Sequence, residues 1–412
     1  MDIVKIIPQI KPYAWGNSTF IPQLLGMETT GQPVAEVWFG THKGGESAID
    51  GQTGTMLGDF LTTHADTYYG ESHLQRFGQE LPLLLKILAI GKPLSIQCHP
   101  SREQARKGYA AELPLHATTD REQWNYKDPQ QKAEVVYALT PMTALCGFRP
   151  IAEIIGYLRE LVPYQFPLVF PFLVTGTDPA QACGSSAQED ALIKRFFSAL
   201  YQLDRGKLSL LIDECVENLD KGERPATTAN GDYLTPWGIA RACLAEYPDD
   251  PGILAPFFLN VVQLAPGEAV FLEPRTLHAY MWGNGVELMS NSDNVLRGGL
   301  THKKVDVSEL LAVLALHTLT PVKCPQVKDA FNRVDVLTPT EEFMLSVMQQ
   351  GSYFINGRTS IELLLCTAGS TTIVADGEPL EFSQGECCVV AASVGAYRLT
   401  VRGQVFCAGV PA

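Results

Sequence analysis

The sequence contains no run of about 20 apolar residues, the length that a membrane-spanning helix requires. Residues 1–16 include charges and prolines and have no continuous apolar segment, so we expect no secretory signal peptide. Basic residues are also scarce: there are 31 against 45 acidic residues, and the formal net charge is −14. This excess of negative charge argues against a general binder of nucleic acids or anionic membranes.

No Cys-x-x-Cys motif occurs among the ten cysteines, and the only close pair is Cys387 and Cys388. In a chain without a secretion signal, such cysteines are expected to be reduced thiols in the core. We therefore expect a cytoplasmic protein. The 412 residues, 46% of them hydrophobic, predict two or three domains with sizeable cores.

Strand-like patterns occupy both ends of the chain, and helical spacing occupies its middle. Residues 1–150 and 251–320 are predicted to form one β-rich domain. Residues 151–250 place apolar side chains at helical spacing, which predicts a helical insertion. Residues 321–412 contain short strands between Gly-rich turns and have no histidine, a pattern typical of a small antiparallel barrel or sandwich.

One short stretch, residues 92–100 (KPLSIQCHP), alternates between apolar and polar side chains as a β-strand does. Its polar face carries Ser95, Gln97 and His99. An amide and an imidazole two residues apart on one face can hold a metal ion if other segments supply more ligands. Taken alone, the stretch is better explained as a half-exposed strand with an ordinary polar face.

The segments on either side of this stretch have clear patterns. Ser101 followed by Gln104 has the form of a capping box and predicts a helix that runs to about residue 111. Upstream, residues 81–89 are almost continuously apolar, as in a strand buried on both faces. Lys86 stands alone in that run. Since an unpaired buried lysine is costly, we expect Lys86 to meet a carboxylate or to reach a polar cleft.

Two further segments carry candidate polar groups. A strand predicted after residue 131 places Lys132 and Glu134 on one face. A Gly-Asn-Gly sequence at residues 283–285 predicts a hairpin turn. This hairpin would put His278 and Glu287 on adjacent strands.

Four residues on strand-like segments are candidates to converge on one metal ion: Gln97, His99, Glu134 and His278. Such nitrogen and oxygen ligands suit zinc, and a catalytic zinc site leaves room for water or substrate. A single carboxylate leaves the site about one unit positive, which favours anionic substrates and stabilises an oxyanion. Phosphate contacts could come from nearby basic residues, which are Lys92, Arg297, Lys303 and Lys304.

These motifs occur in the same order as in the type I mannose-6-phosphate isomerases, zinc enzymes of the cupin superfamily, and resemble theirs. The similar stretches are YAWG (13–16), EVWFGTH (36–42), KPLSIQCHP (92–100), KAE (132–134), EPRTLHAY (273–280) and ELMSNSDNVLRGGLT (287–301). The resemblance implies a mainly β protein with three parts. These are a catalytic domain that is a cupin-type jelly-roll β-sandwich, an α-helical domain, and a C-terminal cupin-like β domain.

The resemblance also implies roles for single residues. The implied ligands of one zinc ion per chain are Gln97, His99, Glu134 and His278. The implied catalytic residues are Arg297, Glu287 and Lys132, and the implied substrate contacts are Ser95, Lys92 and Lys303. The chain departs from the family at residues 131–134, where it reads QKAE in place of the usual HKPE. Gln131 cannot take or give a proton as that histidine could.

The implied reaction interconverts mannose 6-phosphate and fructose 6-phosphate through an enediol, with a proton moved between C2 and C1 by acid–base groups. Either Glu287 or Lys132 could serve as the base. We expect a monomer that acts on a small hexose phosphate. The competing hypothesis is a non-catalytic cupin that binds a metal or a phosphosugar, because of the lost histidine. A cupin oxygenase would more typically hold iron with two histidines and a carboxylate, and another sugar-phosphate isomerase is the remaining alternative.

Overall fold

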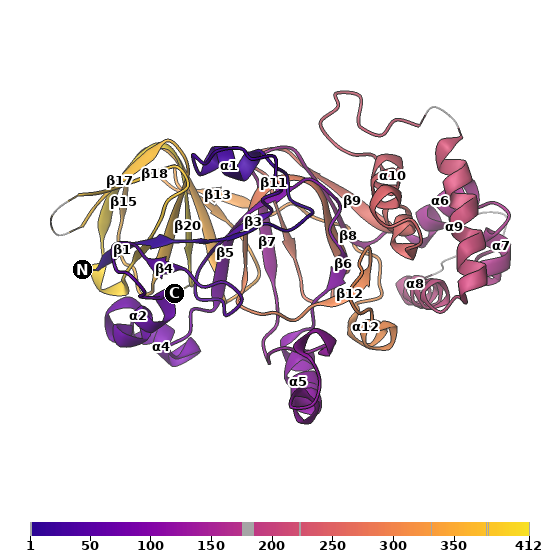
Figure 1. Cartoon of the computed structure of the whole chain (residues 1–412), viewed down its shortest axis with the longest axis horizontal. Coiled ribbons are helices and arrows are strands. Elements are labelled where there is room, and N and C mark those ends of the chain that lie inside the picture. The colour runs from indigo at the N-terminus through magenta and orange to yellow at the C-terminus, as the bar shows by residue number, and fades with distance from the viewer. Residues whose placement is uncertain are drawn as a thin grey trace.

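Two antiparallel sheets and a group of helices follow one another along the long axis of the molecule (Figure 1). The computed structural model describes residues 2–174, 185–221, 224–330, 332–375, 377 and 379–411. Within these residues each sheet has ten strands. The sheet nearer the helices is called the site sheet below, and the other is called the C-terminal sheet.

The site sheet is built from strands that lie before residue 150 and after residue 258. Its main order is β10-β7-β11-β5-β3-β2, β6 lies between β11 and β12, and β8 lies between β11 and β9. The strands are β2 (Gln9–Lys11), β3 (Glu36–Phe39), β5 (Leu83–Ile90), β6 (Ile96–Cys98), β7 (Glu134–Ala138), β8 (Met142–Phe148), β9 (Leu259–Leu264), β10 (Ala269–Leu272), β11 (His278–Ser290) and β12 (Leu296–Gly299).

Two local predictions in this sheet are confirmed. Every residue of β5 is buried, as its apolar run indicated. The Ser101 hydroxyl accepts the Gln104 N–H at 3.3 Å, and the Gln104 side chain accepts the Ser101 N–H at 3.0 Å. This capping box starts α5 (Arg102–His116), which continues past the predicted end. The helix therefore begins directly after the strand that carries Gln97.

The predicted hairpin at residues 283–285 is wrong, because β11 runs without a turn from His278 to Ser290. Its first half pairs with β6 and β8 and its second half with β7 and β5, and the register shifts between Tyr280 and Trp282. Gly283 has a φ of 110°, and a Cβ there would lie 2.5 Å from the Pro141 carbonyl oxygen. The glycine is thus required for close approach between strands, and not for reversal of the chain.

Gly283→Ala should destabilise the protein by about 3 kcal/mol, through unfavourable φ and overlap with the neighbouring strand. The measurement is the midpoint of urea unfolding followed by circular dichroism. Gly156→Ala is the control: it lies within α6 (Ile151–Leu161), and a Cβ there would meet nothing within 4 Å. The control should stabilise the helix by up to about 1 kcal/mol. Equal midpoints for the two variants would contradict the strained-strand explanation.

The C-terminal sheet also contains strands from the start of the chain. Its main order is β13-β14-β15-β20-β16-β19-β1-β4, and β17 pairs with β18 and β20. The strands are β1 (Ile3–Ile7), β4 (Ala48–Ile49), β13 (Gln326–Lys328), β14 (Val334–Val336), β15 (Met344–Ile355), β16 (Glu362–Ala368), β17 (Ser370–Val374), β18 (Leu380–Ser383), β19 (Cys387–Val390) and β20 (Tyr397–Gly409). Two strands from within residues 1–150 therefore belong to this sheet: β1 pairs with β19, and β4 pairs with β1.

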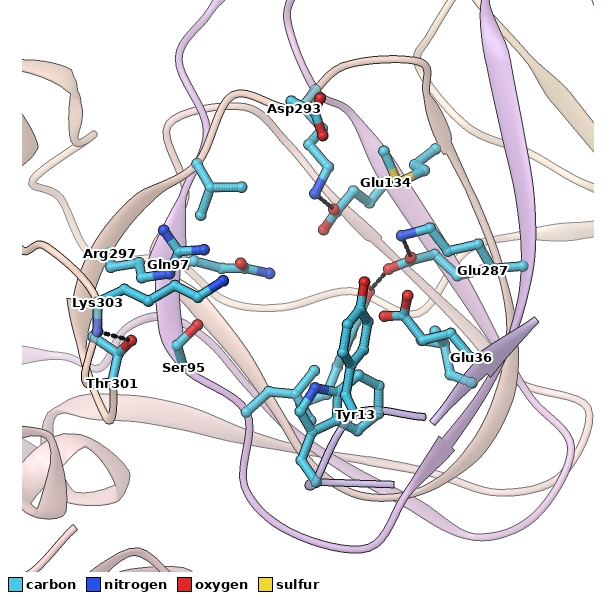
Figure 2. Close-up of a pocket in the computed structure, with 18 of the residues that line it drawn as sticks. Tyr13, Glu36, Ser95, Gln97, Glu134, Glu287, Asp293, Arg297, Thr301 and Lys303 are labelled. Atoms are coloured by element: carbon cyan, nitrogen blue, oxygen red, sulfur yellow. Dashed lines mark hydrogen bonds and ion pairs between the residues drawn. The ribbon is translucent and has the colours of Figure 1, made fainter. Parts of the chain in front are cut away.

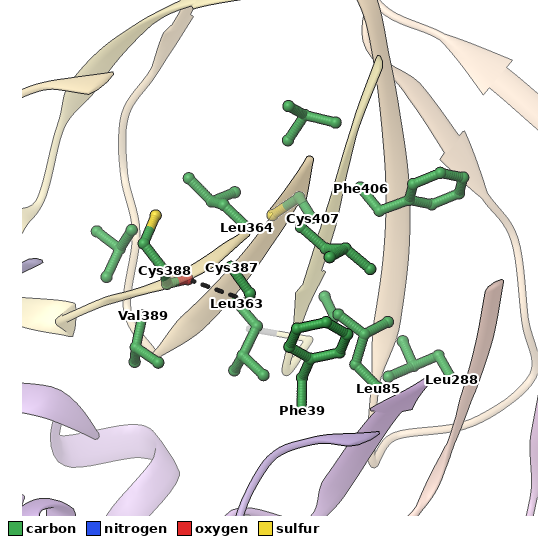
Figure 3. Packing of buried hydrophobic residues seen from close by; sticks show 14 of the residues in the cluster. Phe39, Leu85, Leu288, Leu363, Leu364, Cys387, Cys388, Val389, Phe406 and Cys407 are labelled. Atoms are coloured by element: carbon green, nitrogen blue, oxygen red, sulfur yellow. Dashed lines mark hydrogen bonds between the residues drawn. The ribbon is translucent and has the colours of Figure 1, made fainter. Parts of the chain in front are cut away.

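One buried apolar cluster joins the two sheets (Figure 3). Phe39, Leu85 and Leu288 from the site sheet belong to it together with Leu363 and Phe406 from the C-terminal sheet. Burial of side chains of this size contributes about 1.5–3 kcal/mol each. All nine cysteines in the described ranges are buried and free, as predicted for reduced core thiols.

Residues 151–250 are largely helical in their described part, which leaves out residues 175–184 and 222–223. The helices from this segment onward are α6 (Ile151–Leu161), α7 (Phe166–Val169), α8 (Ser186–Tyr201), α9 (Arg205–Asp220), α10 (Pro236–Glu246), α11 (Ala255–Phe258) and α12 (Val307–Val313). The helices near the N-terminus are α1 (Phe20–Leu24), α2 (Leu57–Thr63), α3 (Ala65–Tyr68) and α4 (Glu71–Phe77). Among the described residues, no helix has the length and apolar character needed to cross a membrane.

Candidate metal centre and active site

Strand register aligns three predicted site residues across the site sheet. Gln97 on β6 lies opposite His278 of β11 on one side and opposite Arg297 of β12 on the other. Directly opposed residues of antiparallel strands share a face and are close neighbours. Residues almost 200 positions apart therefore meet in one row.

The two remaining ligands, Glu134 and His99, come from neighbouring segments and lie close to His278. Glu134 opens β7 and lies opposite Met289 of β11. His99 follows β6 directly, and its ring centroid is 5.1 Å from that of His278. His99, Glu134 and His278 each offer one ligand atom, and these atoms lie within 4.8 Å of one another. All three side chains are buried, with 1% of their surface exposed.

The hydrogen bonds of the two histidines show which ring nitrogens face the cluster. Nδ1 of His99 lies 2.6 Å from the Asn294 carbonyl oxygen, and Nδ1 of His278 lies 2.9 Å from the Thr276 carbonyl oxygen. Because a carbonyl can only accept, each Nδ1 carries the hydrogen and donates it. The Nε2 atom of each neutral ring is then left with a lone pair.

These lone pairs point at a carboxylate. His99 Nε2 lies 3.4 Å from Glu134 Oε1, and His278 Nε2 lies 3.2 Å from Glu134 Oε2. Among the described residues, neither Nε2 atom nor Glu134 Oε2 has a hydrogen-bond partner. Converging lone pairs repel one another unless a cation lies between them. The donor set of two imidazoles and one carboxylate fits zinc. Gln97, which lies opposite His278, is placed to add an amide oxygen.

The electrostatics keep these groups in the form that binds a metal. Burial and the Lys132 ammonium lower the pKa of His99 to about 4. Burial raises the pKa of Glu134, but Lys132 and His99 outweigh that effect and hold it well below the usual range. Lys132 Nζ lies 2.7 Å from Glu134 Oε1. At neutral pH, His99 is therefore a neutral imidazole and Glu134 a carboxylate, as metal ligation requires.

A cavity of about 450 Å³ opens above the cluster, and its two ends differ in chemistry (Figure 2). Ser95, Arg297 and Lys303 lie at one end, which is called the cationic end below. Glu36 and Glu287 lie at the opposite end. Glu134 lies between the two ends. The predicted catalytic residues Arg297, Glu287 and Lys132 line this cavity, as do the predicted ligands Gln97 and Glu134. His99 and His278 are buried next to Glu134 and are not among the lining residues.

The four basic residues predicted as phosphate contacts fall into two groups. Lys92 pairs with Glu246 at 3.0 Å, and Lys304 Nζ lies 3.6 Å from an Asp306 oxygen. Arg297 and Lys303 form no ion pair with any residue in the described ranges. Lys92, which the sequence predicted to bind substrate, does not line the cavity. The two unpaired cations make the cationic end a site for an anionic group.

Comparison with known proteins agrees with this geometry. Residues 3–151 match the family described as phosphomannose isomerase type I, catalytic domain. The chain is 33% identical over 405 residues to the mannose-6-phosphate isomerase of Escherichia coli strain K12, and the match covers 97% of each chain. The chain belongs to the type I mannose-6-phosphate isomerases. The Macaca fascicularis enzyme of that name is 34% identical over 321 residues, or 74% of this chain and 71% of that one.

Solved structures of mannose-6-phosphate isomerases have the same fold over the whole chain. One that is bound with zinc and yttrium superposes with a TM-score of 0.88 at 31% identity and covers 100% of both chains. The Salmonella typhimurium enzyme bound to fructose 6-phosphate and zinc superposes with a TM-score of 0.87 at 30% identity, again over 100% of both chains. The predicted cupin-type fold of this chain is confirmed.

A buried ion pair lies at the end of the cavity opposite the cationic end. The sequence predicted a carboxylate partner for its lysine but did not identify that partner. Lys86 of β5 lies opposite Glu287 of β11, and its ammonium lies 3.0 Å from Glu287 Oε2, which confirms that Lys86 meets a carboxylate. The Tyr280 hydroxyl donates to Glu287 Oε1 at 3.0 Å. Burial raises the pKa of Glu287 despite the opposing effect of Lys86. The raised pKa brings Glu287 closer to the range of a general base.

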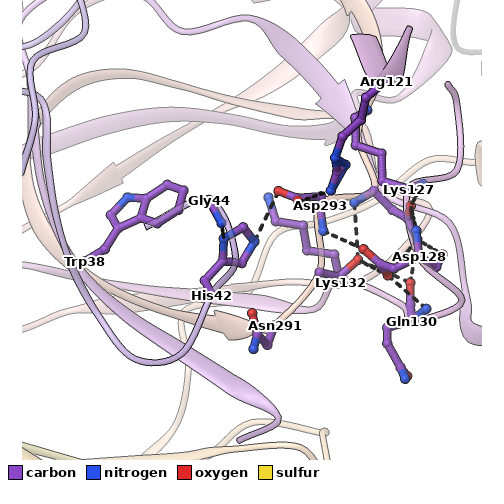
Figure 4. Close-up of polar contacts among 12 residues, drawn as sticks. Trp38, His42, Gly44, Arg121, Lys127, Asp128, Gln130, Lys132, Asn291 and Asp293 are labelled. Atoms are coloured by element: carbon purple, nitrogen blue, oxygen red, sulfur yellow. Dashed lines mark hydrogen bonds and ion pairs between the residues drawn. The ribbon is translucent and has the colours of Figure 1, made fainter. Parts of the chain in front are cut away.

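A polar network on the cavity wall was missed by the sequence reading (Figure 4). His42 Nδ1 accepts the Gly44 N–H at 3.0 Å, so its Nε2–H faces Asp293 Oδ1 at 3.1 Å. Arg121 binds the other oxygen of Asp293 at 2.6 Å. Burial opposes ionisation of Asp293, but His42 and Arg121 outweigh it and lower its pKa to about 2. Both His42 and Asp293 lie in motifs that resembled the family, which was the available signal.

Proposed function

We propose that this chain is a zinc-dependent isomerase that interconverts mannose 6-phosphate and fructose 6-phosphate. One observation carries the proposal. Glu134, whose Oε2 is one of three buried ligand atoms without hydrogen-bond partners among the described residues, lines a cavity together with Arg297 and Lys303. Neither of these two cations forms an ion pair in that part of the chain. A cavity that has a metal cluster in its floor and cations at one end suits a small sugar that carries a phosphate.

The cationic end orients the substrate. Lys303 and the Ser95 hydroxyl bind the phosphate, and the sugar then extends over the metal cluster toward Glu287. Fixing the phosphate at one end places C1 and C2 at a repeatable distance from the acid–base groups, and such positioning lowers the barrier substantially. Residues from β6, β11 and β12 take part, so the rigid sheet holds the geometry.

Glu287 is the base that moves the proton between C2 and C1. An ionised carboxylate can act as it stands, whereas Lys132 must first lose a proton. Lys86 and Tyr280 hold the Glu287 carboxylate in position through its two oxygens. Positioned acid–base groups of this kind contribute about 10²- to 10⁴-fold to the rate.

Charge on the enediol oxygens is stabilised by Arg297 and Lys132, both of which line the cavity. Zinc, when held by Gln97, His99, Glu134 and His278, supplies a positive centre that stabilises developing negative charge. The Lys132 side chain lies 2.7 Å from Glu134 Oε1 and contributes to the same field. Preorganised charges of this kind are commonly the largest single contribution to catalysis.

Gln131 stands where the family usually has a histidine, but the cavity wall still carries an imidazole. Gln131 is not among the lining residues, whereas His42 and Asp293 are. His42 donates its Nε2–H to Asp293 and holds that carboxylate at the cavity wall, where it can accept a hydrogen bond from a sugar hydroxyl.

The deciding experiment is a coupled assay for fructose 6-phosphate formed from mannose 6-phosphate, with zinc measured before and after chelation. We expect one zinc per chain, turnover in the purified protein, loss of turnover on chelation and recovery when zinc is restored. Stoichiometric zinc without isomerisation would overturn the proposal. That outcome would instead support a non-catalytic protein that binds a metal or a phosphosugar.

We further propose that the protein is a cytoplasmic monomer with a catalytic domain (1–150 and 251–320), a helical domain (151–250) and a C-terminal domain (321–412). Free, buried thiols support a reducing compartment. The two-sheet arrangement supports the division, with β1 and β4 crossing to the C-terminal sheet. Gel filtration with light scattering tests the monomer.

A further inference from the structure

Besides Leu300, the loop between β12 and α12 supplies three polar residues to the cavity wall: Thr301, His302 and Lys303. The backbone has positive φ at two successive positions before them, 134° at Gly299 and 51° at Leu300. Leucine seldom adopts this conformation, and it persists only where the surrounding structure holds it. The loop is therefore built into a defined shape at the cationic end.

The chain that follows α10 holds this loop from the side of the helical segment. Asp250 accepts the Thr301 N–H at 3.4 Å, and it also accepts the Gly252 N–H at 2.8 Å. The ring of Tyr247 lies 5.4 Å from the ring of His302, centroid to centroid. Tyr247 caps α10 and lines the same cavity. The position of His302 is thus set by two elements rather than by the loop alone.

The imidazole of His302 donates no hydrogen bond to any described group. Its side chain is exposed and lines the cavity next to Lys303, and it forms no ion pair or hydrogen bond with any described residue. A phosphate has three acceptor oxygens, each with more than one lone pair, so Lys303 and the Ser95 hydroxyl leave acceptors free on its outer side. An imidazole at the mouth of the cavity can donate to those oxygens.

We propose that His302 is a further phosphate-recognising residue, and that Tyr247, from the end of the helical segment, positions it. This inference rests on the proposed function and adds to it a residue on the solvent side of the phosphate. It also gives the helical segment a role at the site, since Tyr247 lies against the imidazole of His302. Selectivity for phosphorylated over unphosphorylated hexoses then depends partly on a contact between the two parts of the chain.

The test compares His302→Ala with His302→Asn in the zinc-loaded protein. We expect His302→Ala to raise the KM for mannose 6-phosphate about 10-fold with kcat changed less than about 2-fold, because a hydrogen bond to a charged group is lost. Inorganic phosphate, titrated by calorimetry, should bind about 10-fold more weakly. His302→Asn keeps an N–H donor and should recover part of both losses.

Two further variants separate a specific contact from general damage. His317 is exposed, lies outside the cavity lining, and serves as the matched control in His317→Ala, which should change neither quantity. Tyr247→Phe keeps the ring and should keep the KM, whereas Tyr247→Leu should raise it.

Unchanged KM and phosphate affinity in His302→Ala would overturn the inference, as would a lower kcat at constant KM. Failure of the proposed function would look different, since the unsubstituted protein would then show no isomerisation at all.

Discussion

Glu134→Gln is expected to abolish zinc binding and isomerase activity together. The substitution removes the only carboxylate from the cluster and leaves His99 and His278 with a neutral amide between them. Even residues that merely orient metal ligands change affinity by 10- to 100-fold, so loss of a ligand charge should weaken zinc binding by at least about 100-fold. Zinc content after gel filtration, measured by mass spectrometry, and turnover in the coupled assay are the two readouts.

Glu287→Gln is the matched control for this prediction. Glu287 is also a buried carboxylate beside a lysine in the same cavity, but its partners are Lys86 and Tyr280 rather than the metal ligands. This variant should keep one zinc per chain and still lose activity, because the base is gone. If Glu134→Gln retains stoichiometric zinc, or Glu287→Gln loses it, the assignment of ligand and base is wrong.

The parts of the site that follow from local patterns could be predicted from the sequence. Alternation over residues 92–100 placed Gln97 and His99 on one polar face, and the capping box after it set the start of α5. Alternation also put Lys132 and Glu134 together, and they form an ion pair. These features depend on neighbours within a few residues, so the sequence carries them directly.

Contacts between distant strands could not be predicted in the same way. The partner of Lys86 is Glu287, and only the register of β5 against β11 brings them together. Nothing near Lys86 specifies that register, so the local pattern indicated a carboxylate without identifying it. His42 and Asp293 lie in loops that follow different strands, so their contact likewise depends on the pairing of distant strands.

The wrong hairpin shows a limit of turn signals. Gly283 and Gly285 flank an asparagine, a pattern typical of tight turns. In the structure these glycines allow β7 and β8 to approach β11 closely, since a Cβ at Gly285 would lie 2.8 Å from the Tyr137 carbonyl oxygen. A glycine needed for close packing and one needed for positive φ in a turn are indistinguishable in one sequence.

Arg297→Ala is expected to lower kcat by about 10²- to 10³-fold while zinc content stays at one per chain. Arg297 lies opposite Gln97 across β6 and β12, forms no ion pair among the described residues, and lines the cavity. Its guanidinium is therefore free to face the charge that develops on the substrate. Arg297→Lys keeps the charge but loses the planar fork, and should recover only part of the rate.

Lys303→Ala separates the stabilisation of charge in the reaction from the binding of phosphate. Lys303 lies at the same end of the cavity and likewise has no ion-pair partner in the described ranges. The phosphate is charged in both the ground state and the transition state. Removal of the Lys303 side chain should therefore mainly raise KM, whereas Arg297→Ala should mainly lower kcat. The two variants would then differ in which constant changes, at equal zinc content. Loss of zinc in Arg297→Ala would instead mean that Arg297 supports the Gln97 ligand across the strand pair and has no direct part in the reaction.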